Sequence, residues 1–597
     1  MAKPIFILGI SCYYHDSAAV LLKDGAVIFA AQEERFTRKK HDEGFPQNAI
    51  AAALHSAGIT AQDLSAVVFY EKPLLKFFDR IIPCAIDVWP RGHGTFQRAA
   101  HEWLTKKLWI PQLIRKELNY AGPLFFTRHH EAHAASAFYP SGFPDAAIVT
   151  VDGVGEWATA TIGYGRGTDL TLRQEIRYPH SLGLLYSALT YYLGFKVNSA
   201  EYKVMGLAPY GEPKYMDRMW KLIDLKKDGS FALNRTYFTY EYGNTMTGRA
   251  LEKLFGQPTR KPESPLTQFH KDIARSLQEV TNAVMLRIVR HAQELCPSEN
   301  LCLAGGVALN CVANGLILRS GIFKNIFIQP AAGDAGGALG AALFVWHQHF
   351  RGARSERMEH VFLGTEYSNE NIASFLRSRG LPSEQLDDTA LIERVASLLE
   401  GENAIGWFQG RMEFGPRALG NRSIIADARN KENWKKVNLK IKFRESFRPF
   451  APTVPVERVS DYFTLDQPPP FGLRPASRES PFMLLVADTR TEKRSEIPAV
   501  THVDGSARIQ TISRKQNARY YDLIKAFERH TGCPVIINTS FNVRGEPIVE
   551  SPEDAVNCFL KTHMEYLVLG NHLLTKTQMP AALLGGTEEY MQRFVLD

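Results

Sequence analysis

The first half of this 597-residue chain contains the same order of predicted elements twice. In the first copy an apolar strand at 5–10 runs into a polar corner at 13–17, and two further strands joined by a tight turn follow at 18–22 and 26–31. The second copy has its strand, corner and two hairpin strands at 147–151, 152–156, 157–164 and 170–176. Two copies of one such unit predict a duplicated α/β domain with a cleft between its halves.

This repeat is similar to the organisation of the actin-like and sugar-kinase superfamily, in which a nucleotide lies between two ribonuclease-H-like lobes. We therefore expect residues 1–350 to form a duplicated, actin-like domain. From about residue 346 the sequence becomes polar and charged, and periodicity resumes after about residue 368. Because the chain is too long for one ordinary core, we expect a linker at 351–368 and a second α/β domain at 369–597.

The run Arg-His-His-Glu-Ala-His that ends at residue 133 predicts a metal site. On a helix, His129 and His133 lie four residues apart and share one face. Asp152 follows the next apolar strand and Asp334 lies in a small-residue corner, so both are candidate carboxylate ligands of a mixed nitrogen and oxygen site. His130 could take the place of His129. The alternative is a pair of helix-surface histidines beside a buried strand.

The charge pattern favours a small anionic ligand over a nucleic acid. The net charge is +7, but the arginines and lysines lie in short motifs such as 417–422 and 440–448 and form no basic tail. The N-terminus has no long apolar stretch, and the seven cysteines show no paired spacing. We therefore expect a cytoplasmic protein with reduced cysteines, no membrane segment and no nucleic-acid partner.

Further polar motifs follow predicted strands. After the strand at 301–304, Gly305 and Gly306 would let backbone amides approach the phosphate or ribose of a nucleotide, and Asn310 lies just beyond them. A plain glycine turn is the alternative. Three clusters rich in arginine, small hydroxyl and amide side chains lie at 410–423, 442–452 and 537–547. Such groups bind phosphoryl and carboxyl-like oxygens in a dry pocket.

Several of these motifs occur together in one order. They are Ser-Cys-Tyr-Tyr-His-Asp-Ser at 11–17, Gln-Glu-Glu-Arg-Phe at 32–36, the histidine run, Gly-Gly-Val-Ala-Leu-Asn at 305–310 and the three basic clusters. In them the chain resembles, over nearly its whole length, the O-carbamoyltransferases of natural-product biosynthesis, of the nodulation-factor and tobramycin carbamoyltransferase type. The resemblance implies a metal-binding first domain like that of the tRNA threonylcarbamoyl transferases, fused to a YrdC-like second domain.

The resemblance also implies a reaction in two stages. The YrdC-like domain takes carbamoyl phosphate and ATP, with magnesium accompanying the ATP, and makes carbamoyl adenylate, releasing phosphate and pyrophosphate. The first domain then transfers the carbamoyl group to a hydroxyl of a small-molecule natural product and leaves AMP. Enclosure protects such a reactive anhydride from water. The fold does not select the acceptor, and a homodimer is expected from the family.

Residue roles follow from the same resemblance. His15 matches a catalytic histidine, and an imidazole suits general-base work because it ordinarily titrates near neutrality. His129, His133, Asp152 and Asp334 match the ligands of iron(II) or another divalent metal. The carbamoyl-phosphate and nucleotide site of the second domain would comprise Arg417, Lys442, Arg448, Arg508, Ser540, Asn542 and Arg544.

Two other functions remain as alternatives. Threonylcarbamoyl transfer to tRNA uses the same two domain types, but the fused order and the Lys-Phe-Arg-Glu-Ser-Phe-Arg motif at 442–448 favour a small-molecule acceptor. An RNA-binding module is disfavoured because no aromatic-rich stacking platform accompanies the arginines. The stretch from about Phe77 to Tyr120 carries no assigned motif and is expected to shape the acceptor pocket.

Overall fold

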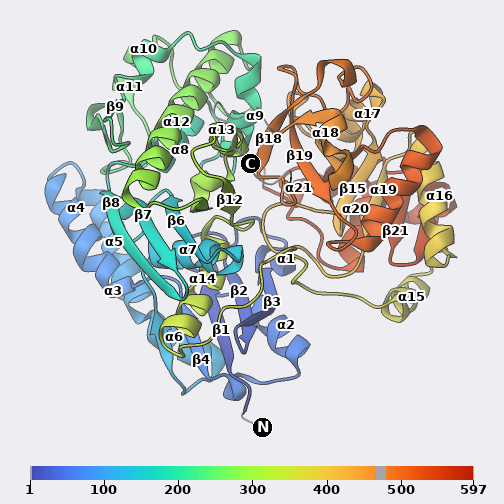
Figure 1. Ribbon diagram of the computed structural model, residues 1–597, viewed down its shortest axis with the longest axis horizontal. Coiled ribbons are helices and arrows are strands. Elements are labelled where there is room, and N and C mark those ends of the chain that lie inside the picture. The colour runs from blue at the N-terminus through green and yellow to red at the C-terminus, as the bar shows by residue number, and fades with distance from the viewer. Residues whose placement is uncertain (1–2, 466–478, 596–597) are drawn as a thin grey trace. The chain divides into compact units, whose positions relative to one another are not determined.

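The computed structural model describes residues 3–465 and 479–595, and the chain forms two compact units. Unit 1 comprises Met1–Glu33 and His41–Met358, and unit 2 comprises Glu34–Lys40 and Glu359–Asp597. The short segment Glu34–Lys40 therefore packs with the second unit, although the sequence predicts one uninterrupted first domain over 1–350. Figure 1 shows both units with their elements labelled.

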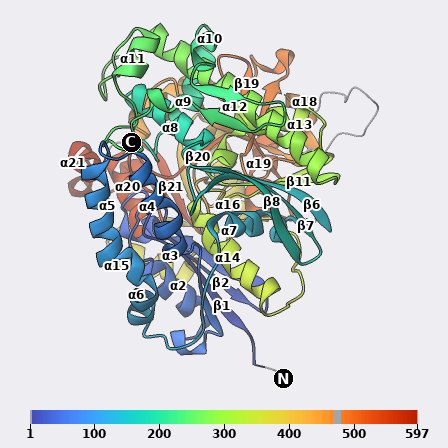
Figure 2. The same cartoon turned by 90° about the vertical axis from the view of Figure 1, so that its left-hand side faces the viewer.

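Unit 1 contains two five-stranded sheets of the same topology. Their strand orders are β3-β2-β1-β4-β5 and β8-β7-β6-β11-β12. In each sheet the first strand of the predicted repeat pairs antiparallel with its hairpin and parallel with a later strand, as Figure 2 shows for the second sheet. The strands are β1 (Phe6–Ser11), β2 (Ala18–Lys23), β3 (Ala26–Gln32), β4 (Ala66–Phe69), β5 (Leu124–Phe126), β6 (Asp145–Val151), β7 (Ala158–Arg166), β8 (Asp169–Arg177), β11 (Asn300–Ala304) and β12 (Asn325–Ile328). The repeat predicted from the sequence thus corresponds to two sheets of unit 1 that share one strand order.

Helices cover the apolar strands of unit 1. Every residue of β1 is buried, which agrees with its continuous apolar sequence. The alanine- and glycine-rich helix α14 (Asp334–Gln348) packs against β1 and against α7 (His129–Phe138). A Cβ atom at Gly340 would collide with the carbonyl oxygen of Ala132, so glycine permits this close helix contact. The contact brings the first turns of α7 and α14 together.

The remaining elements of unit 1 lie outside the two sheets. They are α2 (Gln47–Ala57), α3 (Pro73–Lys76), α4 (Ile82–Asp87), α5 (His93–Thr105), α6 (Ile110–Leu118), α8 (Leu182–Tyr192), α9 (Glu201–Leu207), α10 (Met216–Met219), β9 (Ile223–Leu225), β10 (Phe231–Leu233), α11 (Arg249–Phe255), α12 (Gln268–Leu295) and α13 (Cys311–Arg319).

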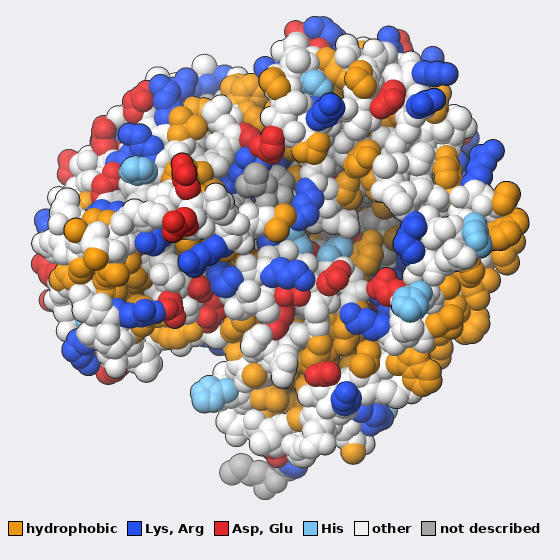
Figure 3. Space-filling view, turned by 180° about the vertical axis from the view of Figure 1, so that it is seen from behind, with side chains coloured by type: hydrophobic (Ala, Val, Ile, Leu, Met, Phe, Trp, Pro, Cys, Tyr) orange, Lys and Arg blue, Asp and Glu red, His pale blue; other side chains and the backbone are white. Residues whose placement is uncertain are grey.

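The helices α3 to α6 form an insertion between β4 and β5 with an apolar surface. Six large hydrophobic side chains on or beside these helices are each more than half exposed, namely Leu74, Phe78, Ile86, Trp89, Leu104 and Trp109. Figure 3 shows hydrophobic side chains gathered along the edge of the molecule where α3–α5 lie. No helix in the described part of the chain is long and apolar enough to cross a bilayer.

Unit 2 is built on one mixed sheet with the strand order β13-β22-β21-β14-β15-β20-β16-β19-β18-β17. Its strands are β13 (Glu384–Gln385), β14 (Ile405–Phe408), β15 (Arg422–Asp427), β16 (Ala451–Pro455), β17 (Phe463–Thr464), β18 (Leu485–Thr489), β19 (Ser506–Ile512), β20 (Ile536–Ser540), β21 (Tyr566–Leu569) and β22 (His572–Thr575). Its helices are α1 (Glu34–Thr37), α15 (Asn369–Ser378), α16 (Asp388–Glu400), α17 (Lys431–Lys436), α18 (Val459–Tyr462), α19 (Ala518–Thr531), α20 (Pro552–Lys561) and α21 (Thr587–Gln592). A buried cluster that includes Trp407 and Phe527 joins α16 and α19 to the sheet. The α/β class is as predicted, and the YrdC-like character of this unit stays a prediction.

Two arginines anchor the segment Glu34–Lys40 in unit 2. Arg38 donates hydrogen bonds to the carbonyl oxygens of Ile548 at 2.7 Å and Pro547 at 2.8 Å, and its guanidinium lies 2.8 Å from a carboxylate oxygen of Glu546. Arg35, which is buried, donates to the carbonyl oxygen of Gly415 at 2.6 Å. The sequence contains no signal that Glu34–Lys40 packs in unit 2, because these partners of Arg35 and Arg38 lie more than 370 residues away in the chain.

Candidate active site

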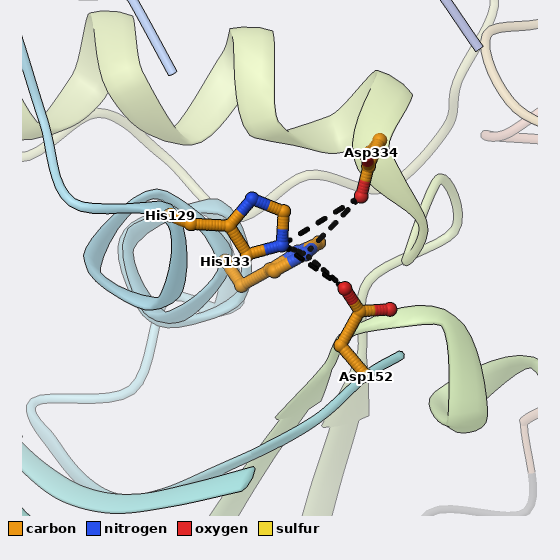
Figure 4. A group of neighbouring side chains, drawn as sticks. All are labelled: His129, His133, Asp152 and Asp334. Atoms are coloured by element: carbon orange, nitrogen blue, oxygen red, sulfur yellow. Dashed lines mark hydrogen bonds and ion pairs between the residues drawn. The ribbon is translucent and has the colours of Figure 1, made fainter. Parts of the chain in front are cut away.

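Four side chains of unit 1 converge at the start of α7, the end of β6 and the start of α14 (Figure 4). The Nε2 atom of His129 lies 3.0 Å from Nε2 of His133 and 3.0 Å from Oδ2 of Asp152. Oδ1 of Asp334 lies 3.7 Å from both Nε2 atoms. We call His129, His133, Asp152 and Asp334 the four-residue cluster. The structure brings together all four residues that the sequence predicts as metal ligands.

The donor set and its spacing fit a divalent cation. One ligand atom from each residue lies within 4.8 Å of the others, and ligands bound at about 2.0–2.2 Å to one ion lie about 3 Å apart. Oδ1 of Asp334 is buried and has no hydrogen-bond partner among the described residues. Imidazole nitrogen with carboxylate oxygen is a donor set suited to several divalent transition metals.

The carboxylates make the four-residue cluster attractive to positive charge. Burial would raise the pKa of Asp152 and Asp334, but the neighbouring histidines hold the pKa of both carboxyls below its usual range. Burial would lower the pKa of His133, yet the two carboxylates outweigh burial and raise it to about 9. Protons on His133 and a divalent cation therefore compete for this site.

His130 lies on the same helix but points to other partners. Its Nδ1 atom lies 2.6 Å from the hydroxyl of Thr150, and its Nε2 atom lies 2.9 Å from the carbonyl oxygen of Ala158. Burial and the neighbouring histidines lower the pKa of His130 to about 3. With both ring nitrogens engaged, His130 packs against the second sheet, and the geometry favours His129 over His130 as the candidate ligand.

His15 lies beside the four-residue cluster. Its Nε2 atom is 3.7 Å from Oδ2 of Asp334, and its Nδ1 atom is 3.1 Å from Oδ2 of Asp16. Burial opposes a charged imidazole, but the carboxylates of Asp334 and Asp16 outweigh burial and raise the pKa of His15 to about 10. The hydroxyl of Tyr70 donates to Oδ2 of Asp334 at 3.3 Å, a contact that the sequence analysis did not anticipate. The predicted catalytic histidine thus lies within reach of the predicted metal site.

The paired glycines also lie beside this cluster. The N–H group of Gly306 donates to Oδ1 of Asp152 at 2.9 Å, and the N–H group of Gly305 donates to the carbonyl oxygen of Ala332. Asn310 caps α13 through the N–H group of Ala313 and exchanges hydrogen bonds with Gln278. The contact from Gly306 holds the side chain of Asp152 in place. A nucleotide-binding role for Gly305, Gly306 and Asn310 stays a prediction.

Glu156 is the residue near the cluster that sequence reasoning missed. It is 6% exposed, and its carboxylate accepts hydrogen bonds from the N–H groups of His129 and Lys72. The sequence places Glu156 in the second polar corner, but the corner alone does not reveal which backbone groups its side chain meets.

In unit 2 a buried lysine occupies the centre of the predicted anion site. Lys442 donates to the carbonyl oxygen of Ser540 at 2.6 Å, to its hydroxyl at 3.1 Å, and to the side-chain oxygen of Asn542. These hydrogen bonds all go to uncharged oxygens. Burial, together with the cations of Arg444 and Arg448, lowers the pKa of Lys442 well below its usual range. We call this group the Lys442 site, and a bound anion would stabilise its charged form.

The predicted arginines occupy different parts of unit 2. Arg544 and Arg448 both lie near Glu445, at 3.4 Å and 3.8 Å, and the N–H group of Arg544 donates to the carbonyl oxygen of Lys442. The structure therefore brings Lys442, Ser540, Asn542 and Arg544 together, with Arg448 linked through Glu445. Arg417 lies in the loop before β15 and Arg508 lies in β19, and their part in the site stays a prediction.

Glu413 organises the loop that carries Arg417. Its buried Oε1 atom accepts hydrogen bonds from the N–H groups of Leu419 at 2.7 Å, Asn421 at 2.9 Å and Arg422 at 3.2 Å. The sequence motif at 410–423 pointed to its arginines and its small hydroxyl and amide side chains, and it did not indicate a role for Glu413. Glu413 has a structural role, because it satisfies three main-chain donors that would otherwise be buried without partners.

Comparison with known proteins gives consistent matches to one family. The model "Carbamoyltransferase N-terminus" matches residues 6–343, and "Carbamoyltransferase C-terminus" matches residues 396–576. A Synechocystis protein called "Uncharacterized protein sll1178" is 53% identical, over 99% of this chain and 100% of that protein. Nodulation protein NolNO of Sinorhizobium fredii is 39% identical, over 94% of this chain and 79% of that protein. Among solved structures, component A of the Acidaminococcus fermentans (R)-2-hydroxyglutaryl-CoA dehydratase covers 58% of this chain and 98% of its own, with 14% identity and a TM-score of 0.31.

Proposed function

Since the chain belongs to the carbamoyltransferase family and is an enzyme that transfers a carbamoyl group, we propose that it is an ATP-dependent O-carbamoyltransferase with a small-molecule hydroxyl acceptor. The observation that carries this proposal is the division of two kinds of polar site between the two units. Unit 1 holds the four-residue cluster with His15 beside it, and unit 2 holds the Lys442 site. One site suits group transfer and the other suits binding of phosphoryl oxygens.

We assign activation of the carbamoyl group to unit 2. Water cleaves carbamoyl phosphate to carbamate and phosphate, and a carbamate oxygen then attacks the α-phosphorus of ATP and expels pyrophosphate. The product is carbamoyl adenylate. The Lys442 ammonium and the guanidiniums of Arg448 and Arg544 bind the phosphoryl oxygens, and the burial of Lys442 strengthens its interaction because the local dielectric constant is low.

We assign transfer to unit 1. The acceptor oxygen attacks the carbamoyl carbon, the bond to the adenylate oxygen breaks, and AMP leaves. His15 accepts the proton of the acceptor hydroxyl. For this step the imidazole must be neutral, whereas Asp334 and Asp16 raise its pKa to about 10. A cation held by Asp334 would weaken the effect of this carboxylate on the imidazolium and would make the neutral form of His15 accessible.

The four-residue cluster would hold iron(II) or another divalent cation. Such a cation polarises carbamoyl or phosphoryl oxygens as a Lewis acid. Magnesium accompanies ATP in this proposal, and a cytoplasmic location and a homodimer stay predictions. The insertion α3–α6 begins beside the cluster, at Tyr70 and Lys72, and we assign it to the acceptor pocket.

The division between the units is tested by separating the two stages. Arg448→Ala should reduce pyrophosphate release from ATP and carbamoyl phosphate at least about 100-fold. His15→Ala should retain release in the first turnover but lose carbamoylation of the acceptor by about 10²–10⁴-fold, the usual contribution of a general base. A hydroxyl acceptor that the enzyme accepts is found first, by screening for ATP-dependent incorporation of labelled carbamoyl groups.

Matched controls are Arg490→Ala in unit 2 and His55→Ala in unit 1, because both side chains are exposed. Both controls should keep wild-type rates in both stages. Equal loss of pyrophosphate release in Arg448→Ala and His15→Ala would contradict the assignment of the stages to different units.

A further inference from the structure

Glu156 connects the main chain of α7 to the loop that carries Asp152. Both oxygens of its buried carboxylate accept hydrogen bonds from the N–H group of His129, at 2.9 Å and 3.0 Å. Oε1 also accepts a hydrogen bond from the N–H group of Lys72 at 2.9 Å. A single carboxylate therefore holds the first residue of α7 and the residue that precedes α3.

The second ring nitrogen of each histidine in the four-residue cluster has no protein partner among the described residues. Metal-binding histidines ordinarily donate the other ring N–H to a carboxylate, a carbonyl oxygen or water, and this fixes the ring. The Nδ1 atoms of His129 and His133 are buried and have no hydrogen-bond partner among the described residues. The Glu156 carboxylate therefore helps to set the direction of the His129 ring by holding its backbone, beside the ring contacts with Asp152 and His133.

The loop from Asp152 to Glu156 is itself held at several points. The N–H group of Asp152 donates to the carbonyl oxygen of Thr159 at 2.9 Å, and the carbonyl oxygen of Gly155 accepts from Arg80 at 2.5 Å. Gly155 packs so closely on α7 that a Cβ atom there would lie 3.0 Å from Cβ and Cδ2 of His129. Because the loop is short and braced, the position of Glu156 is tied to that of Asp152.

We propose that Glu156 is a positioning residue that fixes His129 relative to Asp152 and thereby sets the affinity of unit 1 for a divalent cation. Glu156 contributes no ligand atom to the four-residue cluster. Glu156 acts through the backbone of His129 and through the loop that carries Asp152. This inference rests on the proposed function, because it assumes that the cluster binds a metal ion.

The test is a titration of the metal-free full-length protein with Co²⁺. Calorimetry and the visible absorption of the bound ion measure the binding. Glu156→Ala should weaken Co²⁺ binding about 10–100-fold, the usual effect of losing an outer-shell partner. Glu156→Gln keeps one acceptor oxygen and should lose less. The absorption spectrum of the saturated alanine variant should also change, because the His129 ring is no longer held in one direction.

Glu131→Ala is the matched control. Glu131 lies in the same first turn of α7 and accepts a hydrogen bond from the N–H group of Arg128 at 3.1 Å, but it is not fully buried and holds no residue of the cluster. Glu131→Ala should lower stability by about 1 kcal/mol, and Glu156→Ala should lower it more, because it leaves the N–H groups of His129 and Lys72 without their acceptor. Only Glu156→Ala should change Co²⁺ affinity.

Wild-type affinity in both Glu156 variants would overturn the inference, and so would an equal loss in Glu131→Ala. If Glu156→Ala does not fold, Glu156→Leu decides, because leucine fills the space without an acceptor oxygen, and affinity within twofold of the wild type would refute the positioning role. Absence of Co²⁺ binding by the wild-type protein would instead refute the metal site of the proposed function, so the two failures are distinguishable.

Discussion

Replacement of Arg38 by methionine should strongly destabilise unit 2. Arg38 belongs to the exchanged segment Glu34–Lys40, and its guanidinium is bound to Glu546 and to two carbonyl oxygens. Glu546 is 1% exposed and also accepts hydrogen bonds from the hydroxyl of Tyr590 and the N–H group of Val543. Methionine fills a similar volume but leaves the buried carboxylate without its cation.

The expected loss is about 3–5 kcal/mol, the usual cost of removing one partner from a buried ion pair. The three hydrogen bonds from Arg38 to Glu546, Ile548 and Pro547 give the same size, because at roughly 1–1.5 kcal/mol each they amount to about 3–4.5 kcal/mol. A fourth, to the carbonyl oxygen of Arg35 at 3.2 Å, lies within the segment Glu34–Lys40. In the double variant Arg38→Met/Glu546→Gln the fully buried carboxylate is removed together with its cation, and the partly exposed Asp554, 3.3 Å from the Arg38 guanidinium, keeps its charge. The double variant should recover part of this loss, because the buried charge and its partner are removed together.

The effect should also depend on pH. Burial raises the pKa of Glu546 above its unfolded value, and Arg38 partly opposes that rise. Because the folded pKa is the higher one, the stability linked to this carboxyl is fully present at pH below about 4.3 and is lost as pH rises through the folded pKa. Without Arg38 the folded pKa rises further, so Arg38→Met should be closest to the wild type in acid and most destabilised above pH 7.

Hydrogen exchange of backbone amides in β15 and β20 reports on unit 2 alone and serves as the assay. A loss of 3–5 kcal/mol corresponds to roughly 10²–10⁴-fold faster exchange through global unfolding. Arg379→Met is the matched control, because Arg379 and Glu553 form an ion pair in which both side chains are 54% exposed, and it should change stability by less than about 0.5 kcal/mol. If Arg38→Met costs less than 1 kcal/mol at pH 8, the anchoring role of the segment is refuted.

Three further outcomes follow from the sites themselves. His129→Ala should lower divalent-cation affinity more than about 100-fold, and full metal content in the purified variant would reject it as a ligand. Cation affinity should rise with pH until about pH 9, by up to roughly tenfold per unit, because protons on His133 compete with the cation; a flat profile from pH 6 to 9 would contradict the raised pKa. Lys442→Met should abolish the protection that inorganic phosphate gives unit 2 against hydrogen exchange. The variant should lose little stability, since it removes a buried charge held only by neutral oxygens. Retained protection would show that phosphate binds elsewhere.

The local sequence was sufficient for the repeated elements and for the candidate ligands. The apolar runs of β1 and β6 and the hairpins after them are local patterns, and the two sheets reproduce their order. His129 and His133 could be paired because helical spacing places them on one face. Asp334 was accessible to prediction as an acidic residue at the start of a helix rich in small residues.

Other features depend on contacts between residues far apart in the chain. The roles of His129 and His130 could not be separated by spacing, because the choice rests on Thr150 and Ala158, which engage the ring of His130. Likewise, nothing near Glu413 in sequence indicates that its side chain would satisfy three N–H groups of one loop.

The sequence by itself indicated the α/β class and the repeat, because apolar strand patterns are local, and helical spacing paired His129 with His133; the residues of the Lys442 site followed from the family resemblance. Only the tertiary structure decided that Glu34–Lys40 packs in unit 2, that Glu156 holds His129, and that Asp334 lies within 3.7 Å of both histidines. The physical reason is that these outcomes depend on which buried polar group finds a partner. That partner is supplied by chain folding over tens to hundreds of residues, and no local pattern records it.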